Sequence, residues 1–237
     1  MCLILVAWQK LAEHPLVVAA NRDEFHARPA APAAFWREQS SILAGRDLEA
    51  KGTWMGVSRG GRFAAVTNYR GAREPSAAES RGALVARFLA GREAPQRYVG
   101  GLVGDRYSGF NLLAADDEEL WWTSNRDGSP RRLEAGIYGL ANALLDSPDV
   151  EAAKARFTQV LDIPAVDVIF DLLAKSIIVN PQYGTRCATV LLKAKDGRVR
   201  YAERTFSPDG AEQDTVQFAF SAENRGQSPK LSEALGL

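Results

Sequence analysis

The sequence contains few of the side chains that many enzyme classes need. Its 237 residues include two cysteines, Cys2 and Cys187, and two histidines, His14 and His26. Two cysteines are too few for a disulfide framework or a four-ligand zinc site. We therefore expect a reducing, cytoplasmic location and no metal. No glycine-rich phosphate loop occurs, so we also expect no cofactor. The histidines fall in a predicted turn and loop, which argues against a cysteine–histidine protease.

An excess of one charge and a long apolar run are also lacking. Lysine plus arginine and aspartate plus glutamate each number 29, so the formal net charge is zero. This balance predicts no nucleic acid partner, and it permits a homo-oligomer. No segment approaches the roughly 20 apolar residues of a membrane span. The apolar start lacks a basic lead and is followed by Gln9 and Lys10, which is not typical of a secretory signal.

Short apolar segments alternate with predicted pairs of helices. Tight turns between successive strands indicate antiparallel sheets, and the helices between them indicate layers that cover the sheets. We predict one α+β domain over residues 1–237, built as a four-layer α-β-β-α sandwich; a two-layer α+β fold remains the alternative. The expected strands are 3–8, 16–20, 53–58, 62–67, 110–115, 118–123, 137–142, 187–194, 198–206 and 216–221, and the expected helices are 81–90, 95–102, 150–161 and 166–175.

Cys2 is the strongest candidate for chemistry. Met1 is removable because Cys2 is small, and removal leaves one residue with both a thiol and a free α-amine. That amine has a reference pKa of about 7.7–8.0, so it can accept the thiol proton near neutral pH. Nucleophile and base would then belong to the same residue. The alternative is that Cys2 simply opens a buried strand, since cysteine is often buried.

The tetrapeptide Asn21-Arg22-Asp23-Glu24 follows the strand predicted to pair with the Cys2 strand. We interpret it as the end of that strand and the start of a loop. Hairpin geometry places its first three residues near Cys2. A carboxylate there could hold the α-ammonium, and an arginine could favour the thiolate. The alternative is that the tetrapeptide is a solvated surface loop. We also expect a surface loop over the Pro- and Ala-rich stretch Arg28–Pro32.

Three further polar residues lie at the ends of apolar strands. Asn68 and Asn142 each end a predicted strand, where a side-chain amide could donate to an oxyanion. Asparagine is also common after strands because it tolerates turns, which is the simpler interpretation of these two residues taken alone. Arg186 precedes the strand that begins at Cys187, and could point into a site or into solvent.

Several short motifs occur together in an order that resembles the NRDE family, also called the transport and Golgi organisation protein 2 family. They extend from residue 1 to about residue 205, and each is weak alone. The matching motifs are Met1-Cys2-Leu3-Ile4, Ala20-Asn21-Arg22-Asp23-Glu24, Gly52-Thr53-Trp54-Met55-Gly56, Thr67-Asn68-Tyr69-Arg70, Tyr138-Gly139-Leu140-Ala141-Asn142-Ala143 and Tyr183-Gly184-Thr185-Arg186.

This resemblance implies an N-terminal-nucleophile hydrolase fold, similar more distantly to bile-salt hydrolases and penicillin V acylases. It implies that Cys2 is the nucleophile and that Asp23 holds its amine. By the same resemblance, Asn68 and Asn142 match the oxyanion donors. One departure is Ala20, where those hydrolases carry an active-site arginine. Arg22 should point to the opposite face from Asp23, unless the chain bends.

Two functions follow from this resemblance. In the first, the protein is a hydrolase that cleaves an amide or thioester through Cys2, with Arg186 beside the nucleophile. In the second, the same pocket binds an acyl-CoA, a lipid or haem without turnover. A third option, a scaffold in protein trafficking, follows only from the association of eukaryotic relatives with Golgi organisation. We expect Asn21, Arg22 and Tyr69 to contact the substrate or ligand.

Overall fold

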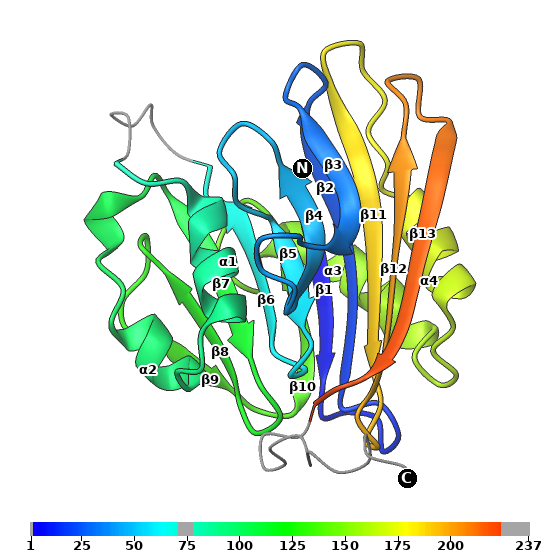
Figure 1. Cartoon of the computed structure of the whole chain (residues 1–237). Coiled ribbons are helices and arrows are strands. Elements are labelled where there is room, and N and C mark those ends of the chain that lie inside the picture. The colour runs from blue at the N-terminus through cyan, green and yellow to red at the C-terminus, as the bar shows by residue number, and fades with distance from the viewer. Residues whose placement is uncertain (1, 71–77, 224–237) are drawn as a thin grey trace, which may run out of the picture.

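Two antiparallel sheets form the centre of the protein. The computed structural model describes residues 2–70 and 78–223. Within these residues sheet A has six strands and sheet B has seven, and the sheets lie face to face (Figure 1). The order across sheet A is β10 (Gly136–Leu140), β1 (Leu3–Trp8), β2 (Leu16–Phe25), β11 (Tyr183–Lys193), β12 (Arg198–Phe206) and β13 (Glu212–Ser221). The order across sheet B is β3 (Ala30–Phe35), β4 (Ile42–Asp47), β5 (Met55–Ser58), β6 (Phe63–Asn68), β7 (Phe110–Ala115), β8 (Leu120–Ser124) and β9 (Arg131–Leu133).

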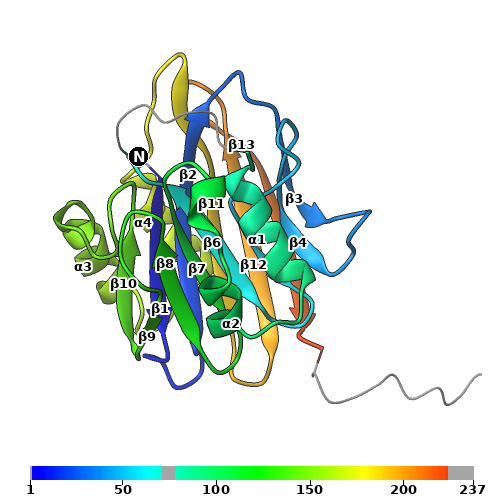
Figure 2. The same cartoon turned by 90° about the vertical axis from the view of Figure 1, so that its left-hand side faces the viewer.

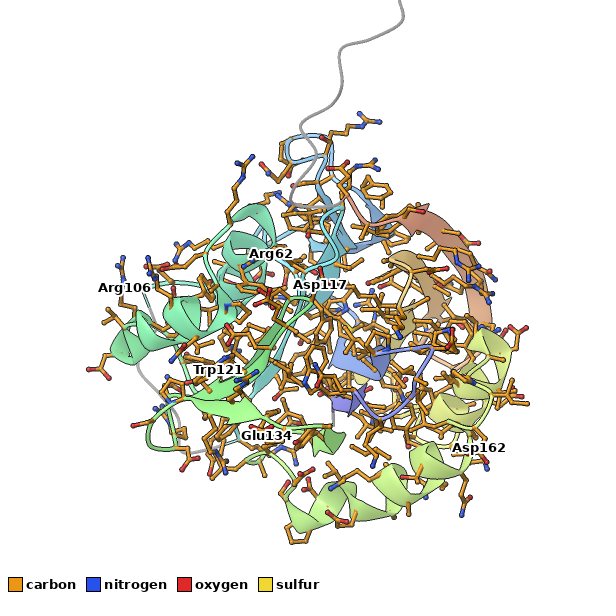
Figure 3. The ribbon with its side chains drawn as sticks, turned by 90° about the horizontal axis from the view of Figure 1, so that it is seen from below. Arg62, Arg106, Asp117, Trp121, Glu134 and Asp162 are labelled. Atoms are coloured by element: carbon orange, nitrogen blue, oxygen red, sulfur yellow. The ribbon has the colours of Figure 1, made fainter. Side chains whose placement is uncertain are left out.

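Helices cover the outer face of each sheet. Figure 2 shows α1 and α2 in front of sheet B, while α3 and α4 lie against sheet A. From below, Trp121 lies on the α1 and α2 side and Asp162 lies on the α3 and α4 side (Figure 3). In the described residues no helix has the length and apolar character needed to cross a membrane. The helices are α1 (Arg81–Ala90), α2 (Pro95–Gly100), α3 (Glu151–Gln159) and α4 (Val166–Ala174), with short 3-10 turns at Gly104–Arg106 and Pro148–Val150.

The strand β1 explains why four layers form. All of its residues are buried. Ile4 and Val6 pack into the core between the sheets, whereas Leu3 and Leu5 pack into the core beneath α3 and α4. A strand covered on both faces is a continuous apolar run rather than an alternating one. The predicted α-β-β-α sandwich is confirmed.

The predicted helix that begins after Ser80 is present as α1. The Ser80 side chain accepts a hydrogen bond from the Gly82 backbone N–H, which satisfies a donor that the first helical turn leaves unpaired. Gly91 ends the helix, and its N–H donates to the carbonyls of Arg87 and Phe88. Leu84 and Phe88 face sheet B and are fully buried. Local capping therefore fixes where α1 begins, beside the end of β6 that carries Asn68.

The prediction that residues 21–24 leave the strand was wrong. β2 continues through them to Phe25 because β11 pairs with it along its whole length. In that register Arg22 lies opposite Cys187, and Asp23 lies opposite Thr185. β11 itself begins at Tyr183 rather than at Cys187, so Arg186 lies within the strand at an irregularity in the pairing. Pairing with a long neighbour outweighs the loop-like composition of a polar tetrapeptide.

The stretch predicted as a surface loop, Arg28–Pro32, also enters a sheet in part. β3 begins at Ala30 and contains Pro32. A proline is tolerated there because β3 is an edge strand of sheet B and its register shifts between Ala31 and Ala34. Sequence analysis therefore did not predict β3, and it also missed β4 and β9.

A carboxyl group, that of Glu203, is buried between the two sheets. Its Oε1 accepts the Ala33 backbone N–H at 2.7 Å, and its Oε2 lies 3.4 Å from the Thr189 hydroxyl. Only 1% of Glu203 is exposed. Burial raises the pKa of Glu203 from 4.5 to about 7, although these hydrogen bonds and the charge of Arg22 oppose the shift. At a pH between these two pKa values, the folded protein therefore keeps the Glu203 proton, whereas the unfolded chain has released it.

We expect this proton to make stability fall as pH rises. Between the unfolded pKa of 4.5 and the folded pKa of about 7, the unfolded state loses the proton first, so the free energy of unfolding declines and then levels off. The total loss is about 3 kcal/mol. In urea titrations across this range, the free energy of unfolding of the wild type should fall by this total amount relative to that of Glu203→Gln, which lacks the proton. The exposed Glu118→Gln is the control, and parallel curves for wild type and Glu203→Gln would contradict the assignment.

Candidate active site around Cys2

Cys2 lies at the end of sheet A where β1 begins. Leu3 pairs with Asn21, so the antiparallel register brings Cys2 opposite Arg22 and its sulfur within reach of the Asp23 backbone. The Cys2 Sγ atom lies 3.4 Å from both the backbone nitrogen and the backbone oxygen of Asp23. It accepts a hydrogen bond from the first and donates one to the second. Met1 lies outside the described residues, so its removal stays a prediction.

A cavity of about 110 Å³ opens beside Cys2 between the two sheets and the first turn of α1. Figure 1 shows the start of β1 and the start of α1 at the same end of the sandwich. Three elements distant in sequence therefore meet at the thiol. The lining residues from β2 are Arg22, Asp23 and Glu24, those from sheet B and the segment before β5 include Trp54 and Asn68, and those from the start of α1 are Ser80, Arg81 and Gly82.

The Asp23 carboxylate is fixed by a residue of β11. The Thr185 hydroxyl donates to Asp23 Oδ1 at 2.6 Å and accepts the Ile178 backbone N–H at 2.9 Å. The Tyr183 hydroxyl donates to the Asp23 backbone oxygen at 3.2 Å. Thr185 is 1% exposed, so this arrangement is shielded from water. The motif that contains Tyr183 and Thr185 was visible in the sequence, but only the register of β11 against β2 shows that they contact Asp23.

The electrostatic surroundings keep the Cys2 thiol protonated at rest. Burial raises the pKa of Cys2 above its ordinary value, and the negative charge of Asp23 raises it further. The hydrogen bond from the Asp23 backbone and the positive charge of Arg22 oppose these effects. Burial, together with the charges of Cys2 and Asp23, also raises the pKa of Tyr183. A base close to Sγ is therefore needed before the sulfur can act as a nucleophile.

Arg22 lies toward sheet B, as expected from strand alternation, and still lines the Cys2 cavity. Its guanidinium lies 4.3 Å from the centre of the Trp54 ring. The nearest carboxylate oxygens belong to Glu24, at 3.8 Å, and Asp47, at 3.9 Å. The chain need not bend to bring Arg22 to the cavity, because the cavity lies between the sheets, at the end where the Asp23 backbone contacts the Cys2 sulfur.

The two predicted oxyanion donors are neighbours. Asn68 ends β6, is exposed and lines the Cys2 cavity. The Asn142 side chain is buried, and its Nδ2 donates to the Asn68 backbone oxygen at 2.8 Å. The backbone N–H of Arg70 donates to the Asn142 carbonyl at 2.7 Å. Asn142 therefore ties the end of β10 to the end of β6 and stands behind Asn68 rather than on the cavity wall.

Three other candidates do not line this cavity. The Arg186 Nη1 donates to the Phe25 and Arg28 carbonyls, both at 3.0 Å, and so holds the loop that follows β2. The Asn21 amide donates to the Leu173 carbonyl in α4 at 3.0 Å; Asn21 borders only a cleft of about 20 Å³ behind the main cavity. The backbone N–H of Tyr69 donates a hydrogen bond to a main-chain carbonyl. The predicted catalytic role of Arg186 and the predicted substrate contacts of Asn21 and Tyr69 stay predictions.

Several residues that line the cavity were not predicted as site residues, among them Arg81 and Trp54. Arg81 is the first residue of α1, and its Nη1 donates to the Gly109 carbonyl at 3.1 Å. The Ser80 cap located the helix start in the sequence, but nothing there placed it beside Cys2. Trp54 belongs to one of the quoted motifs and provides the aromatic face beneath Arg22.

Solved structures with the same fold include two hydrolases. One is the N-acylethanolamine-hydrolyzing acid amidase ortholog of Caenorhabditis elegans, with a TM-score of 0.52 and 12% identity over 81% of this chain and 92% of that chain. The other is a mutant of the conjugated bile acid hydrolase of Clostridium perfringens, with a TM-score of 0.55 and 9% identity over 93% of this chain and 92% of that chain. At such low identity the likeness establishes the N-terminal-nucleophile hydrolase type of fold alone.

Sequence comparison identifies the family. Residues 1–173 match the family described as Transport and Golgi organisation 2. The Transport and Golgi organization protein 2 homolog of Bos taurus is 35% identical over 80% of this chain and 86% of its own length. The corresponding protein of Homo sapiens is 34% identical over the same shares. The Drosophila melanogaster protein is 30% identical over 57% of this chain and 54% of its own length. The chain therefore belongs to the transport and Golgi organisation 2 family.

Proposed function

We propose that the protein is a hydrolase that cleaves a linear amide, or a thioester, through Cys2. The observation that carries the proposal is the position of Sγ, which lines a cavity and contacts the backbone of Asp23, whose carboxylate is fixed by Thr185. A nucleophile, a positioned carboxylate and an open space for the reacting carbonyl are thus adjacent. The shared fold with two hydrolases supports the proposal.

The proposed reaction begins with removal of Met1. The Cys2 α-amine accepts the thiol proton while Sγ attacks the carbonyl carbon of the substrate. The C–N or C–S bond then breaks, and the leaving nitrogen or sulfur takes the proton from the ammonium. The acyl group remains on Sγ as a thioester. Water adds to it, its proton passes through the amine, and a carboxylic acid leaves as the thiol is restored.

The surrounding residues have separate roles in this scheme. The Asp23 carboxylate holds the α-ammonium in place after proton transfer. The Asn68 amide donates to the developing oxyanion, a contribution of about 3 kcal/mol for one such donor. Asn142 fixes the position of Asn68 through the 2.8 Å hydrogen bond. This division follows from Asn68, and not Asn142, lining the cavity.

The second candidate is binding of an acyl-CoA, a lipid or haem without turnover. The raised pKa of the Cys2 thiol favours it, because a protonated thiol is a poor nucleophile. The cavity volume favours the hydrolase. At about 110 Å³ within the described residues, it suits an acyl group rather than a whole large ligand, for which roughly 300–1,000 Å³ is usual.

Intact mass spectrometry tests the proposal. The purified protein should lack the mass of Met1 and, after brief exposure to an aryl thioester, should carry one acyl group that fragmentation assigns to Cys2. Cys187 serves as the internal control because its buried sulfur borders a different cavity. Retention of Met1, or an acyl group on Cys187 alone, would reject the mechanism. Saturable thioester binding without any covalent adduct would select the binding function.

A further inference from the structure

The Cys2 cavity is lined by three arginines whose charges are neutralised to different degrees. Arg28 is fully paired, because its Nε donates to Asp47 at 2.7 Å and its Nη1 donates to Glu49 at 3.1 Å. Arg22 and Arg81 also line the cavity but have no such partner at hydrogen-bond distance in the described residues. Three carboxylates, those of Asp23, Glu24 and Asp47, line the same cavity, so the lining is balanced in formal charge, but the charges of Arg22 and Arg81 are not met at hydrogen-bond distance.

Arg22 leaves a donor unused. Only 6% of its surface is exposed, yet its Nη1 has no hydrogen-bond partner in the described part of the chain. The carboxylates of Glu24 and Asp47 lie at 3.8 and 3.9 Å, beyond good hydrogen-bond distance. Stacking over Trp54 orients the guanidinium but satisfies no N–H. A buried donor left without a partner costs about 1–3 kcal/mol, unless a ligand or water accepts it.

Arg81 adds the positive end of a helix to the same wall. It is the first residue of α1, whose ten residues direct their N-terminal partial positive charge at the cavity. Its side chain donates to the neutral Gly109 carbonyl and forms no ion pair with any described carboxylate within 4 Å. A helix N-terminus with free donors is a common place for carboxylate and phosphate groups.

The acidic residues of the cavity already have their own donors. Asp23 accepts from Thr185, and Asp47 accepts from Arg28 and from the backbone N–H groups of Glu49 and Ala50. Glu24 Oε1 accepts the Phe25 backbone N–H at 2.9 Å. These carboxylates are thus at least partly satisfied, whereas the Arg22 Nη1 donor has no partner in the described residues, and an anion satisfies such a donor where a cation does not.

We propose that an anionic group of the substrate, a carboxylate or a phosphate, binds beside Cys2 between the Arg22 guanidinium and the Arg81 end of α1. This proposal rests on the proposed function where it calls the ligand a substrate, whereas binding of the anionic group itself needs no turnover. It defines the substrate class as acyl compounds that carry a negative charge close to the bond that is cleaved. Favouring the Cys2 thiolate is the other role that these two arginines could have, and the experiment separates the two.

Alkylation with a matched pair of reagents tests the anion site. Iodoacetate and iodoacetamide both form a thioether with Sγ and release iodide, but only the first carries a carboxylate. A change in the fraction of thiolate alters both rates equally, so it cancels in their ratio. We expect the iodoacetate to iodoacetamide ratio at Cys2 to exceed that of free cysteine. Arg81→Gln should lower the ratio roughly ten-fold, as expected for loss of one partly screened charge.

Two variants make the result specific. Arg81→Lys keeps the charge and should restore most of the ratio. Arg87→Gln removes an arginine of the same helix that pairs with Glu79 outside the cavity, and it should leave the ratio unchanged. Mass spectrometry after digestion assigns each adduct to Cys2. Circular dichroism confirms that each variant is folded.

Each remaining outcome either supports or overturns the anion site. The anion site would be overturned by an unchanged ratio in Arg81→Gln or by an equal fall of the ratio in Arg87→Gln. It would also be overturned if Cys2 reacted with iodoacetamide but not with iodoacetate, or if Cys2 reacted with neither reagent. Protection of Cys2 by inorganic phosphate at lower concentration than by acetate would identify a phosphate group, and the reverse a carboxylate; protection by neither overturns the site. A high ratio without any acyl-enzyme would reject the hydrolase and keep the anion site.

Discussion

Cys2→Ala is expected to lower turnover of any amide or thioester substrate by at least about 1,000-fold, because no other group replaces the attacking sulfur. The variant removes only one sulfur atom from a half-buried position, so the fold should persist. Alanine is also small, so Met1 remains removable and the α-amine stays available. Steady-state rates and acyl-enzyme mass, measured on wild type and variant in parallel, provide the readout.

Cys187→Ala is the matched control for this experiment. Its sulfur is buried on the other side of Arg22, beside Glu203 and a second cavity of about 210 Å³. Its removal should cost about 1 kcal/mol of stability and leave turnover unchanged. Comparable loss of activity in both cysteine variants would indicate a structural cause. Full activity in Cys2→Ala would show that the chemistry resides elsewhere.

Gly52→Ala is expected to lower the free energy of unfolding by about 3 kcal/mol, at the upper end for overpacking. A Cβ at Gly52 would lie 2.5 Å from the Gly82 carbonyl carbon and 2.7 Å from its oxygen, both backbone atoms that cannot rotate away. The Thr53 backbone N–H donates to that same Gly82 oxygen at 3.3 Å, so the two segments approach main chain to main chain. Thermal denaturation should show a midpoint roughly 10 °C lower.

The close approach at Gly52 also affects the site, since Gly82 follows Arg81 at the start of α1. A displaced helix start should lower the alkylation ratio at Cys2 along with stability. Gly100→Ala is the control, because a Cβ there meets no atom within 4 Å. It lies at the end of α2 and should be neutral or slightly stabilising, since alanine favours helix by up to about 1 kcal/mol over glycine. Equal stability of the two variants would show that the backbone adapts at Gly52.

The polar tetrapeptide at residues 21–24 shows where sequence reasoning reached its limit. Its composition is typical of a loop, and its position near Cys2 followed from hairpin pairing alone. Its strand conformation depends on β11, which lies more than 150 residues away along the chain and pairs with it residue by residue. No local pattern records such a partner, because strand conformation is decided by the neighbouring strand.

The sequence by itself determined the family, the four layers, the position of α1 and the closeness of Cys2 to Asp23. The family followed from six motifs in order along the chain and implied the four-layer fold, whereas α1 and the closeness of Cys2 to Asp23 followed from local capping and one short hairpin. Only the tertiary structure decided that Thr185 orients Asp23, that Asn142 stands behind Asn68, and that Arg81 joins Arg22 at the cavity. These contacts join segments far apart in the chain, and their geometry is set when the two sheets and α1 pack together.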